Sequence, residues 1–287
     1  MTKRIPEFLY KYRECSDRAI ENLQDNLVWC GTLDNYNDPY EGYTTLHFLP
    51  IYKAFLNIET LEHYKNVLSQ LNNVEEITKF ASSELGFSSE EIESQITEQQ
   101  IHQDEYNKSF REKHRQSTAI CSFAEEYDNR LMWSHYTDDH AGFCIGYETK
   151  QMKKFLYKVK YKNEIFDISN DIIKIMTHKG DSKFNPRIIK PNQMVIQKDD
   201  VWKYEKEWRL INPRSRDTID DFEFDNKTVE NKGYTYKLTP SKLYLGTRIS
   251  EENKLKLISI AKAQNLTVNQ MIMDETSYKL IPNKIIG

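Results

Sequence analysis

The spacing of apolar residues changes from a strand period to a helix period between residue 51 and about residue 116. Within this segment Leu61, Tyr64, Leu68 and Leu71 recur three or four residues apart, which places them on one face of a helix. The segments on both sides alternate apolar with polar residues instead, the period of a strand that is buried on one face. The sequence therefore predicts a sheet-forming chain with a helical insertion at about 51–116.

Strand patterns precede and follow this insertion. Before it, FLYKYR and NLVWCGTL predict two strands, and Ser16 and Asp17 are typical of the start of a helix between them. After it, strands are predicted at TAICSFAEE, FCIGYET, KLYLGTRI and LTVNQMIM, and helices at DNRLMWSHYTDDHAG and from Ser250 to about Gln264. We expect one α+β domain over residues 1–287.

Composition and charge exclude several classes of protein. A content of 38% hydrophobic and 12% aromatic residues can fill a core, and a net charge of -4 gives no general attraction to nucleic acid or to an anionic membrane. No apolar run reaches about 18 residues, and the charged start of the chain does not have the pattern of a secretory signal. We expect a cytoplasmic protein with no membrane partner.

The four cysteines, Cys15, Cys30, Cys121 and Cys144, are far apart in the sequence and include no CxxC pair. This spacing favours buried free thiols over a zinc ribbon or a disulfide framework. The chain also lacks GxGxxG, a Walker loop and GxSxG, which weakens the case for Rossmann, P-loop and α/β-hydrolase chemistry.

The stretch WKYEKEWRLI, residues 202–211, places two carboxylates and a guanidinium at alternate positions. With the period of a strand, Glu205, Glu207 and Arg209 share one face, and the aromatic residues with Lys206 occupy the other. A solvated face or an ordinary ion pair also explains such a triplet. Whether the charges do chemistry depends on what else converges there.

Three further segments gather polar residues. They are the first strand (Tyr10, Lys11, Tyr12, Arg13), the NDPYEG loop (Asn37, Asp38, Glu41), and the MWSHYTDDH segment (Trp133, Ser134, His135, Tyr136, Asp138, His140). A tight turn explains the loop, and an amphipathic helix explains the aromatic residues of the third segment. His135 and His140 are five residues apart and do not share a helix face, so the spacing does not predict a metal site.

The order of these runs resembles a known family. LYKYR, LVWCGTLDNYNDPYEG, CSFAEEYDNRLMWSHYTDDHAGFCIGYE and WKYEKEWRLI are similar, in sequence and order, to the bacterial domain of unknown function family 2971. More distantly, the plan of a first strand with a basic residue, a middle motif with hydroxyl and aromatic residues, and a late strand bearing Glu resembles the ADP-ribosyltransferase group. That group uses NAD as a substrate, and the resemblance implies a mixed, largely antiparallel split sheet with flanking helices.

The same resemblance implies roles for particular residues. Arg13 (or Lys11) would match the NAD-binding residue of the first strand, although the familiar His is absent there. Ser122 or Tyr136 would match the middle motif, and Glu207 (or Glu205) the late glutamate beside the ribose. The candidate catalytic residues are Glu207, Glu205, Arg13, His135 and Tyr136, and the candidate NAD-binding residues are Tyr10, Lys11, Tyr12, Asn37, Asp38, Ser122, Trp133 and Arg209.

Three functions stay open. The first is NAD-dependent group transfer to a macromolecular acceptor, as in a toxin or phage-defence effector, where a carboxylate stabilises an oxocarbenium-like transition state. On this hypothesis, Glu207→Gln abolishes activity and leaves folding intact. The second is a non-catalytic ligand sensor or a protein-interaction module, with the acidic helical insertion as the surface that meets a partner. The third is a metal-dependent nuclease that uses Asp138, His140, Glu205 and Glu207.

Overall fold

The computed structural model describes residues 4–47, 70–71, 74–86, scattered positions between 88 and 116, 118–177, 191–211 and 233–286. Contacts group the chain into two compact units. The first comprises Met1–Asp38, Gln116–Asn163 and Lys198–Gly287, and the second Pro39–Arg115 and Glu164–Gln197. The predicted insertion at about 51–116 falls mostly within the second unit, and many of its residues lie outside those described. That the whole chain forms one domain stays a prediction.

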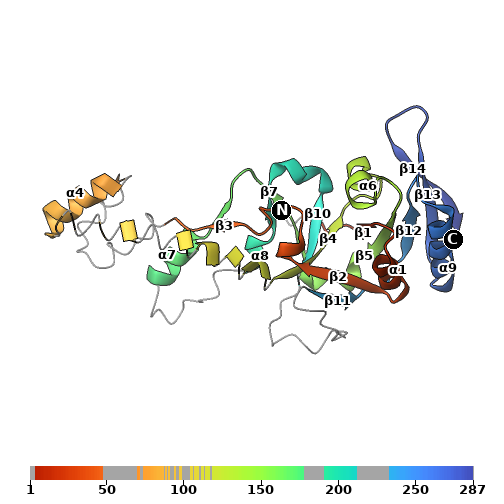
Figure 1. Ribbon diagram of the computed structural model, residues 1–287, viewed down its shortest axis with the longest axis horizontal. Helices are drawn as coiled ribbons and strands as arrows, with labels where there is room; N and C mark the ends of the chain where they lie inside the picture. Colours follow the sequence, from red (N-terminus) through yellow and green to blue (C-terminus); the bar gives the residue numbers. More distant parts are fainter. Residues whose placement is uncertain are drawn as a thin grey trace. The chain divides into compact units, whose positions relative to one another are not determined.

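Ten strands of the first unit, among the described residues, form one sheet (Figure 1). Its main path runs β11 (Gly233–Lys237), β2 (Leu27–Thr32), β4 (Ala119–Ala124), β1 (Phe8–Arg13), β5 (Phe143–Glu148), β12 (Lys242–Leu245), β13 (Thr267–Met273) and β14 (Leu280–Ile286). The strand β10 (Glu207–Ile211) pairs with β4 on one side and with β6 (Leu156–Lys158) on the other. Among these pairs only β12 with β13 is parallel, which confirms the prediction of a mixed, largely antiparallel sheet.

Helices cover both faces of this sheet. On one face α1 (Asp17–Gln24) and α9 (Glu251–Ala263) bury Leu23 and Leu257 against the main core. On the other face α6 (Arg130–Tyr136) buries Met132 and Trp133 beside Tyr10 and Tyr12. The alternation along β1 explains the division, because its odd-numbered and even-numbered residues point to opposite faces.

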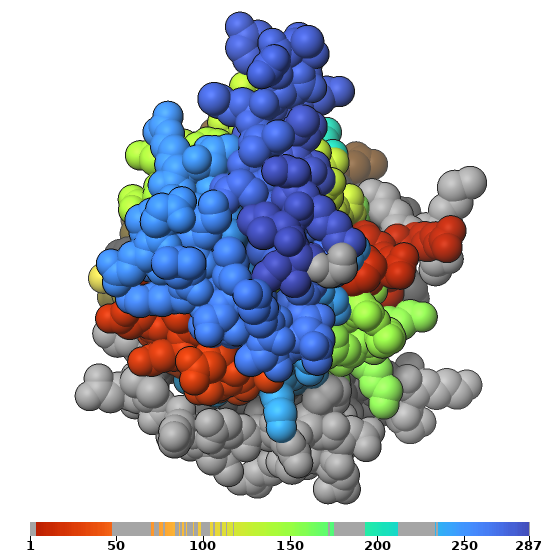
Figure 2. Space-filling model, turned by 90° about the vertical axis from the view of Figure 1, so that its right-hand side faces the viewer, coloured from red at the N-terminus to blue at the C-terminus, as the bar shows by residue number. Residues whose placement is uncertain are grey.

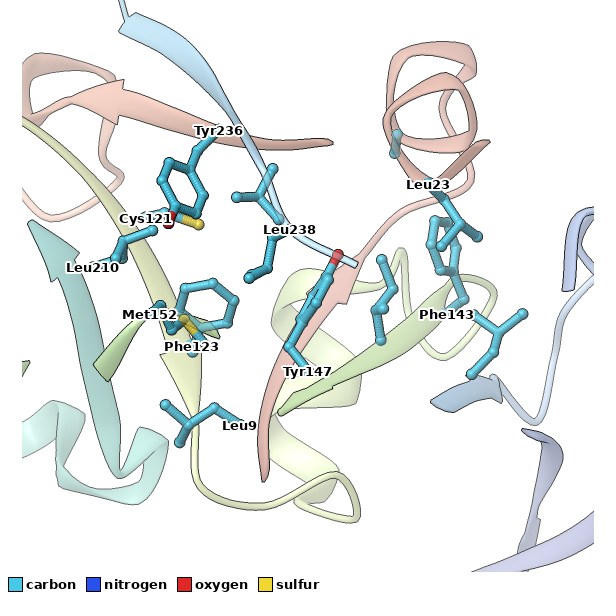
Figure 3. Close-up of a cluster of buried hydrophobic side chains, with 14 of the residues drawn as sticks. Leu9, Leu23, Cys121, Phe123, Phe143, Tyr147, Met152, Leu210, Tyr236 and Leu238 are labelled. Carbon is cyan, nitrogen blue, oxygen red and sulfur yellow. The ribbon is translucent and has the colours of Figure 1, made fainter. Parts of the chain in front are cut away.

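The main core lies between the sheet and the helices α1 and α9. Figure 3 shows Leu9, Phe123, Tyr147 and Met152 converging from separate strands and turns, with Leu23 contributed by α1. All of these side chains are buried. Burying apolar side chains of this size stabilises a fold by about 1.5–3 kcal/mol each, so this cluster fixes the strands that carry the polar residues discussed below.

The sheet opens along the middle of β4. On one edge β10 pairs with β4 over the whole strand, from Glu207↔Ala124 to Ile211↔Ile120. On the other edge β2 pairs with the start of β4, and β1 pairs with its end at Tyr10↔Ala124 alone. In the described part of the chain, residues 121–123 of β4 therefore have no strand neighbour on this edge.

The second unit contains short elements. Its strands β3 (Thr44–Thr45) and β8 (Phe166–Asp167) pair in parallel, and its helices include α4 (Val74–Leu85), α7 (Ser169–Thr177) and α8 (Pro191–Met194). The α4 helix lies within the predicted helical insertion and buries Phe80 and Ala81. Asn107 both accepts the N–H of Leu46 and donates to its carbonyl, which fixes the end of β3.

At one end of the sheet, in the described part of the chain, β14 forms a hairpin with β13. Figure 2 shows this hairpin in dark blue, extending beyond the α9 layer of the first unit. Ile281 and Ile285 are exposed on β14, and Pro282 lies between them. This edge of the sheet, among the described residues, is therefore partly apolar.

Asn129 ties α6 to the turn that precedes β10. Its side-chain oxygen accepts the N–H groups of Leu131 and Met132, and its amide donates to the Tyr204 carbonyl at 2.7 Å. We expect Asn129→Ala to lower the free energy of unfolding by about 1–2 kcal/mol, because it removes both the helix cap and the link to Tyr204.

The matched control for this change is Asn129→Ser. Serine caps a helix about as well but is too short to reach Tyr204. In urea unfolding, the free energy of unfolding of Asn129→Ser should therefore lie between those of the wild type and Asn129→Ala. If Asn129→Ser lost as much stability as Asn129→Ala, the helix cap would contribute nothing to the free energy of unfolding.

Candidate ligand-binding site

A cavity of about 430 Å³ lies in the first unit and includes the opening of the sheet. Its lining combines basic, acidic, amide and aromatic side chains. The lining residues are Tyr10, Lys11, Tyr12, Arg13, Trp29, Gly31, Asn35, Tyr36, Asn37, Ser122, Phe123, Ala124, Met132, His135, Tyr136, Lys198, Glu205 and Glu207. A cavity of this size and mixed character is typical of a small-molecule site.

The basic wall of the cavity consists of Lys11 and Arg13 on β1. The Lys11 ammonium donates to the Ser122 carbonyl at 3.2 Å, across the opening between β1 and β4. A partly buried carbonyl without a partner would cost free energy, so the Lys11 side chain supplies the donor that a neighbouring strand would otherwise provide. The opening thus brings a cation into the cavity wall.

The acidic wall comes from the segment that joins β9 (Gln197–Lys198) to β10. The residues between them form a 3-10 helix, η6 (Asp200–Glu205), and Lys206 then adopts a left-handed conformation with φ 46°. The prediction of one strand over 202–211 is therefore wrong for residues 202–205 and right for 207–211. Glu205 and Glu207 still reach the same cavity, because the left-handed residue between them turns the chain.

Lys198 joins the two carboxylates of this wall. Its ammonium lies 2.8 Å from Oε2 of Glu205 and 3.5 Å from Oε2 of Glu207. The Tyr136 hydroxyl donates to Oε1 of Glu205 at 2.6 Å, and the N–H of Glu207 donates to the Tyr161 hydroxyl at 2.8 Å. All three charged side chains are buried, so these contacts are formed with little solvent screening.

Arg209 binds the Glu207 carboxylate of the acidic wall. Its Nε donates to Oε1 of Glu207 at 2.8 Å and one terminal nitrogen donates to Oε2 at 3.0 Å, a bidentate pair. The guanidinium is fully buried and is not part of the cavity lining. Arg209 therefore contacts a lining residue without lining the cavity itself, and its role in ligand binding stays a prediction.

The two carboxylates differ in acidity. Burial alone would raise the pKa of Glu207, but Arg209, Lys198 and the Ser122 hydroxyl outweigh it and lower the pKa to about 2. Burial raises the pKa of Glu205, and the negative charge of Glu207 adds to the rise, whereas Lys198 and Tyr136 oppose it. Glu207 is therefore a fixed anion, and Glu205 is the carboxylate that takes up a proton more readily.

The helix α6 and the loop after β2 supply the remaining lining. Tyr136 and the exposed His135 come from the last turn of α6. On the loop, the Tyr36 hydroxyl donates to the Ile120 carbonyl at 2.9 Å and accepts from Ser122 at 3.3 Å. Asn35 and Asn37 beside it face the cavity.

A strained turn follows α6. Asp138, Asp139 and His140 all have positive φ, at 49°, 48° and 71°. Gly142 closes the turn, where an added Cβ would lie 2.1 Å from the Arg13 carbonyl oxygen. Only glycine fits this approach, so the turn fixes the backbone of Arg13.

Most of the side chains singled out in the sequence meet in this cavity. They are Tyr10, Lys11, Tyr12, Arg13, Asn37, Ser122, His135, Tyr136, Glu205 and Glu207. Asp38, Trp133 and Arg209 are buried and do not line it. The Trp133 ring packs in the core under α6, and its N–H donates to the Tyr127 carbonyl at 2.7 Å.

Several lining residues were not predicted, Lys198 and Trp29 among them. Lys198 lies in QKDD, a run whose composition is that of an exposed loop, so only its distance of seven residues from Glu205 connects it with the site. Trp29 and Tyr36 follow ordinary strand and loop patterns. Their role depends on strand pairings that are distant in sequence.

The described residues hold no group of three or more His, Cys, Asp or Glu side chains placed to share a metal ion. As predicted, none of the four cysteines forms a disulfide: Cys30, Cys121 and Cys144 are buried, and Cys15 is partly buried. No helix in the described part of the chain is long and apolar enough to span a membrane.

Comparison with known proteins adds one finding. Residues 132–210 match the family described as Protein of unknown function (DUF2971). The match supports the resemblance to that family, and it contains Tyr136, Lys198 and the acidic wall, whereas the basic wall lies outside it. Neither the curated proteins nor the solved structures gave a significant match.

From the ion pair between Arg209 and Glu207 we predict how the stability of the fold depends on pH. The pKa of Glu207 is about 2 in the folded protein against an ordinary value of 4.5, so its ionised form stabilises the fold. This contribution is complete above about pH 4.5 and is lost as the pH falls toward 2. We expect Glu207→Gln to lower the free energy of unfolding at neutral pH by about 3 kcal/mol, since Arg209 stays buried without its anion.

Urea unfolding between pH 2.5 and 7 measures this effect. The difference between the wild type and Glu207→Gln should shrink as the pH falls. Glu126→Gln is the control, because Glu126 pairs with Lys206 at the surface and should change little at any pH. A difference that stays constant with pH would contradict the assignment of Glu207 as a stabilising anion.

Proposed function

We propose that the cavity binds NAD and cleaves its bond between nicotinamide and ribose, passing the ADP-ribose unit to water or to a macromolecular acceptor. The observation that carries this proposal is the separation of charge within one cavity. Lys11 and Arg13 lie on one wall, and Glu205 and Glu207 with Lys198 form another. Oxidised NAD has a matching character, with an anionic pyrophosphate and a cationic nicotinamide ring.

The basic wall suits the pyrophosphate. Arg13 offers a planar set of donors that can bind two phosphate oxygens, and Lys11 contributes a second positive charge. Tyr36, Trp29 and Tyr12 offer aromatic surface for stacking against a base.

The acidic wall suits the reacting ribose. When the bond between C1′ and nicotinamide breaks, the electron pair leaves with the nicotinamide and positive charge develops on the ribose. The fixed anion Glu207 would stabilise that charge. The acceptor then adds through its oxygen or nitrogen to C1′, and Glu205 would take the proton that the acceptor releases.

A toxin or defence effector is one setting for such an activity, and the acceptor would then be a protein or nucleic acid. A sensor is the second candidate. It is favoured by the neutralisation of the acidic wall, because Arg209 and Lys198 balance the two carboxylates even without a ligand. In that case NAD would raise the melting temperature of the protein, and no nicotinamide would be released.

Release of nicotinamide from NAD by the purified protein tests the proposed reaction. We expect release by the wild type, and a loss on the order of 100-fold in rate for Glu205→Gln, since this change removes the proton acceptor but leaves Arg209 paired with Glu207. Glu126→Gln should keep full activity. Glu205 gives a cleaner test than Glu207, whose substitution also leaves a buried guanidinium without its anion.

Release of nicotinamide by Glu205→Gln at the wild-type rate would remove this carboxylate from the mechanism. Label transfer from NAD to lysate macromolecules separates transfer from hydrolysis. NADH serves as a ligand control, because its reduced ring carries no positive charge and should bind more weakly to the acidic wall.

The basic wall yields a separate prediction. Arg13→Met should raise the KM for NAD by about 10-fold or more, because a hydrogen bond to a charged group contributes about 1.5–3 kcal/mol. Lys256→Met, on the exposed side of α9, is the charge-matched control. Steady-state kinetics would show an unchanged KM in Arg13→Met if the pyrophosphate bound elsewhere.

A further inference from the structure

Lys198 occupies an unusual position for a lysine. Its side chain is only 4% exposed, and it lines the cavity beside both carboxylates. Lysine is rarely buried unless its charge is paired, so a position this deep depends on specific contacts. The ammonium also lies 4.7 Å from the centre of the Trp202 ring, which covers it from another side.

The backbone around Lys198 is held firmly. Its carbonyl accepts the N–H of Lys162 at 2.9 Å, and the next residue, Asp199, caps η6 by accepting the N–H of Val201 at 2.8 Å. The side chain therefore starts from a fixed point on β9 and spans to η6 and β10. Its ammonium contacts a carboxylate on each of them.

The contacts of the two carboxylates are unequal. Glu207 has a bidentate partner in Arg209, and its contact with Lys198 is the longer one at 3.5 Å. Glu205 has no arginine, and its charged partner is Lys198 at 2.8 Å. The Tyr136 hydroxyl donates to its other oxygen. Removal of Lys198 would thus leave Glu207 paired and Glu205 with a neutral partner.

We propose that Lys198 is a positioning residue that keeps Glu205 ionised at neutral pH, so that Glu205 can accept the proton of the acceptor while Arg209 holds Glu207 as the fixed anion. The catalytic meaning of this inference rests on the proposed function. Lys198 acts through Glu205 and touches no reacting atom in this scheme.

The groups that face Glu205 determine how it titrates. They are Tyr136 from α6, Tyr161 from β7 (Lys160–Tyr161), Lys198 from β9, Tyr204 on its own helical turn, and Glu207 from β10 with Arg209 behind it. Of these, Lys198 is the cation in direct contact with Glu205. Without it, burial and Glu207 would raise the pKa of Glu205 further.

The first experiment needs no catalytic activity. Carboxyl carbon NMR of glutamate-labelled protein follows the titration of both residues, with Glu205→Gln and Glu207→Gln to assign the signals. In Lys198→Met we expect the titration of Glu205 to move to higher pH and that of Glu207 to move less, and in Lys198→Arg we expect Glu205 to return toward the wild-type value. An unchanged Glu205 titration in Lys198→Met overturns the proposal.

Lys198→Gln replaces Lys198→Met if the methionine variant does not fold, because glutamine keeps hydrogen-bond donors without the charge. If neither folds, the wild type decides. Glu205 must be ionised at neutral pH there, and a Glu205 that is still protonated at neutral pH overturns the proposal.

Kinetics then test the link to catalysis. Activity that needs ionised Glu205 rises with pH through the pKa of that residue, so the acid limb of kcat should move to higher pH in Lys198→Met. We expect kcat at neutral pH to fall by about 100-fold with a smaller change in KM, and Lys198→Arg to recover part of the loss. A lower kcat with an unshifted acid limb would indicate a merely structural lysine. Absence of nicotinamide release by the wild type would reject the proposed function, and the NMR titration would still decide the role of Lys198.

Discussion

The bidentate pair between Arg209 and Glu207 is the interaction on which the first unit depends. A buried guanidinium is costly unless its charge is matched, and both oxygens of Glu207 are engaged by it. The pair lies on the face of β10 opposite the main core, so it determines which side of that strand can be polar. It also supplies the cavity with an anion whose charge does not depend on pH in the neutral range.

The opening in the sheet has a comparable double role. Residues 121–123 of β4 lack a strand neighbour on one edge within the described chain, and Lys11 compensates by donating to the Ser122 carbonyl. The same side chain gives the cavity a positive charge. One residue therefore has two effects: its hydrogen bond offsets part of the cost of the incomplete ladder, and its charge makes this wall of the cavity basic.

Local patterns in the sequence predicted the strands and helices that pack by their own periodicity. FLYKYR, the α6 segment and the segment of α4 all formed as expected, because alternating or helical spacing decides which face is buried. Residues 202–205 did not form a strand, since the left-handed Lys206 breaks the alternation, and no residue type there signals a positive φ. The positions of Lys198, Trp29 and Arg209 in the fold depend on pairings between strands that are distant in sequence. The spacing of residues within one segment does not predict such pairings.

The hairpin at the end of the sheet has a consequence for how this protein behaves at high concentration. An exposed outer strand with isoleucines invites a second sheet to extend the ladder, the first step toward aggregation. Pro282 interrupts β14 with a residue that has no N–H, and Lys284 adds a charge two positions further on. These two residues act as gatekeepers, because both disfavour the pairing of another strand with this edge of the ten-stranded sheet.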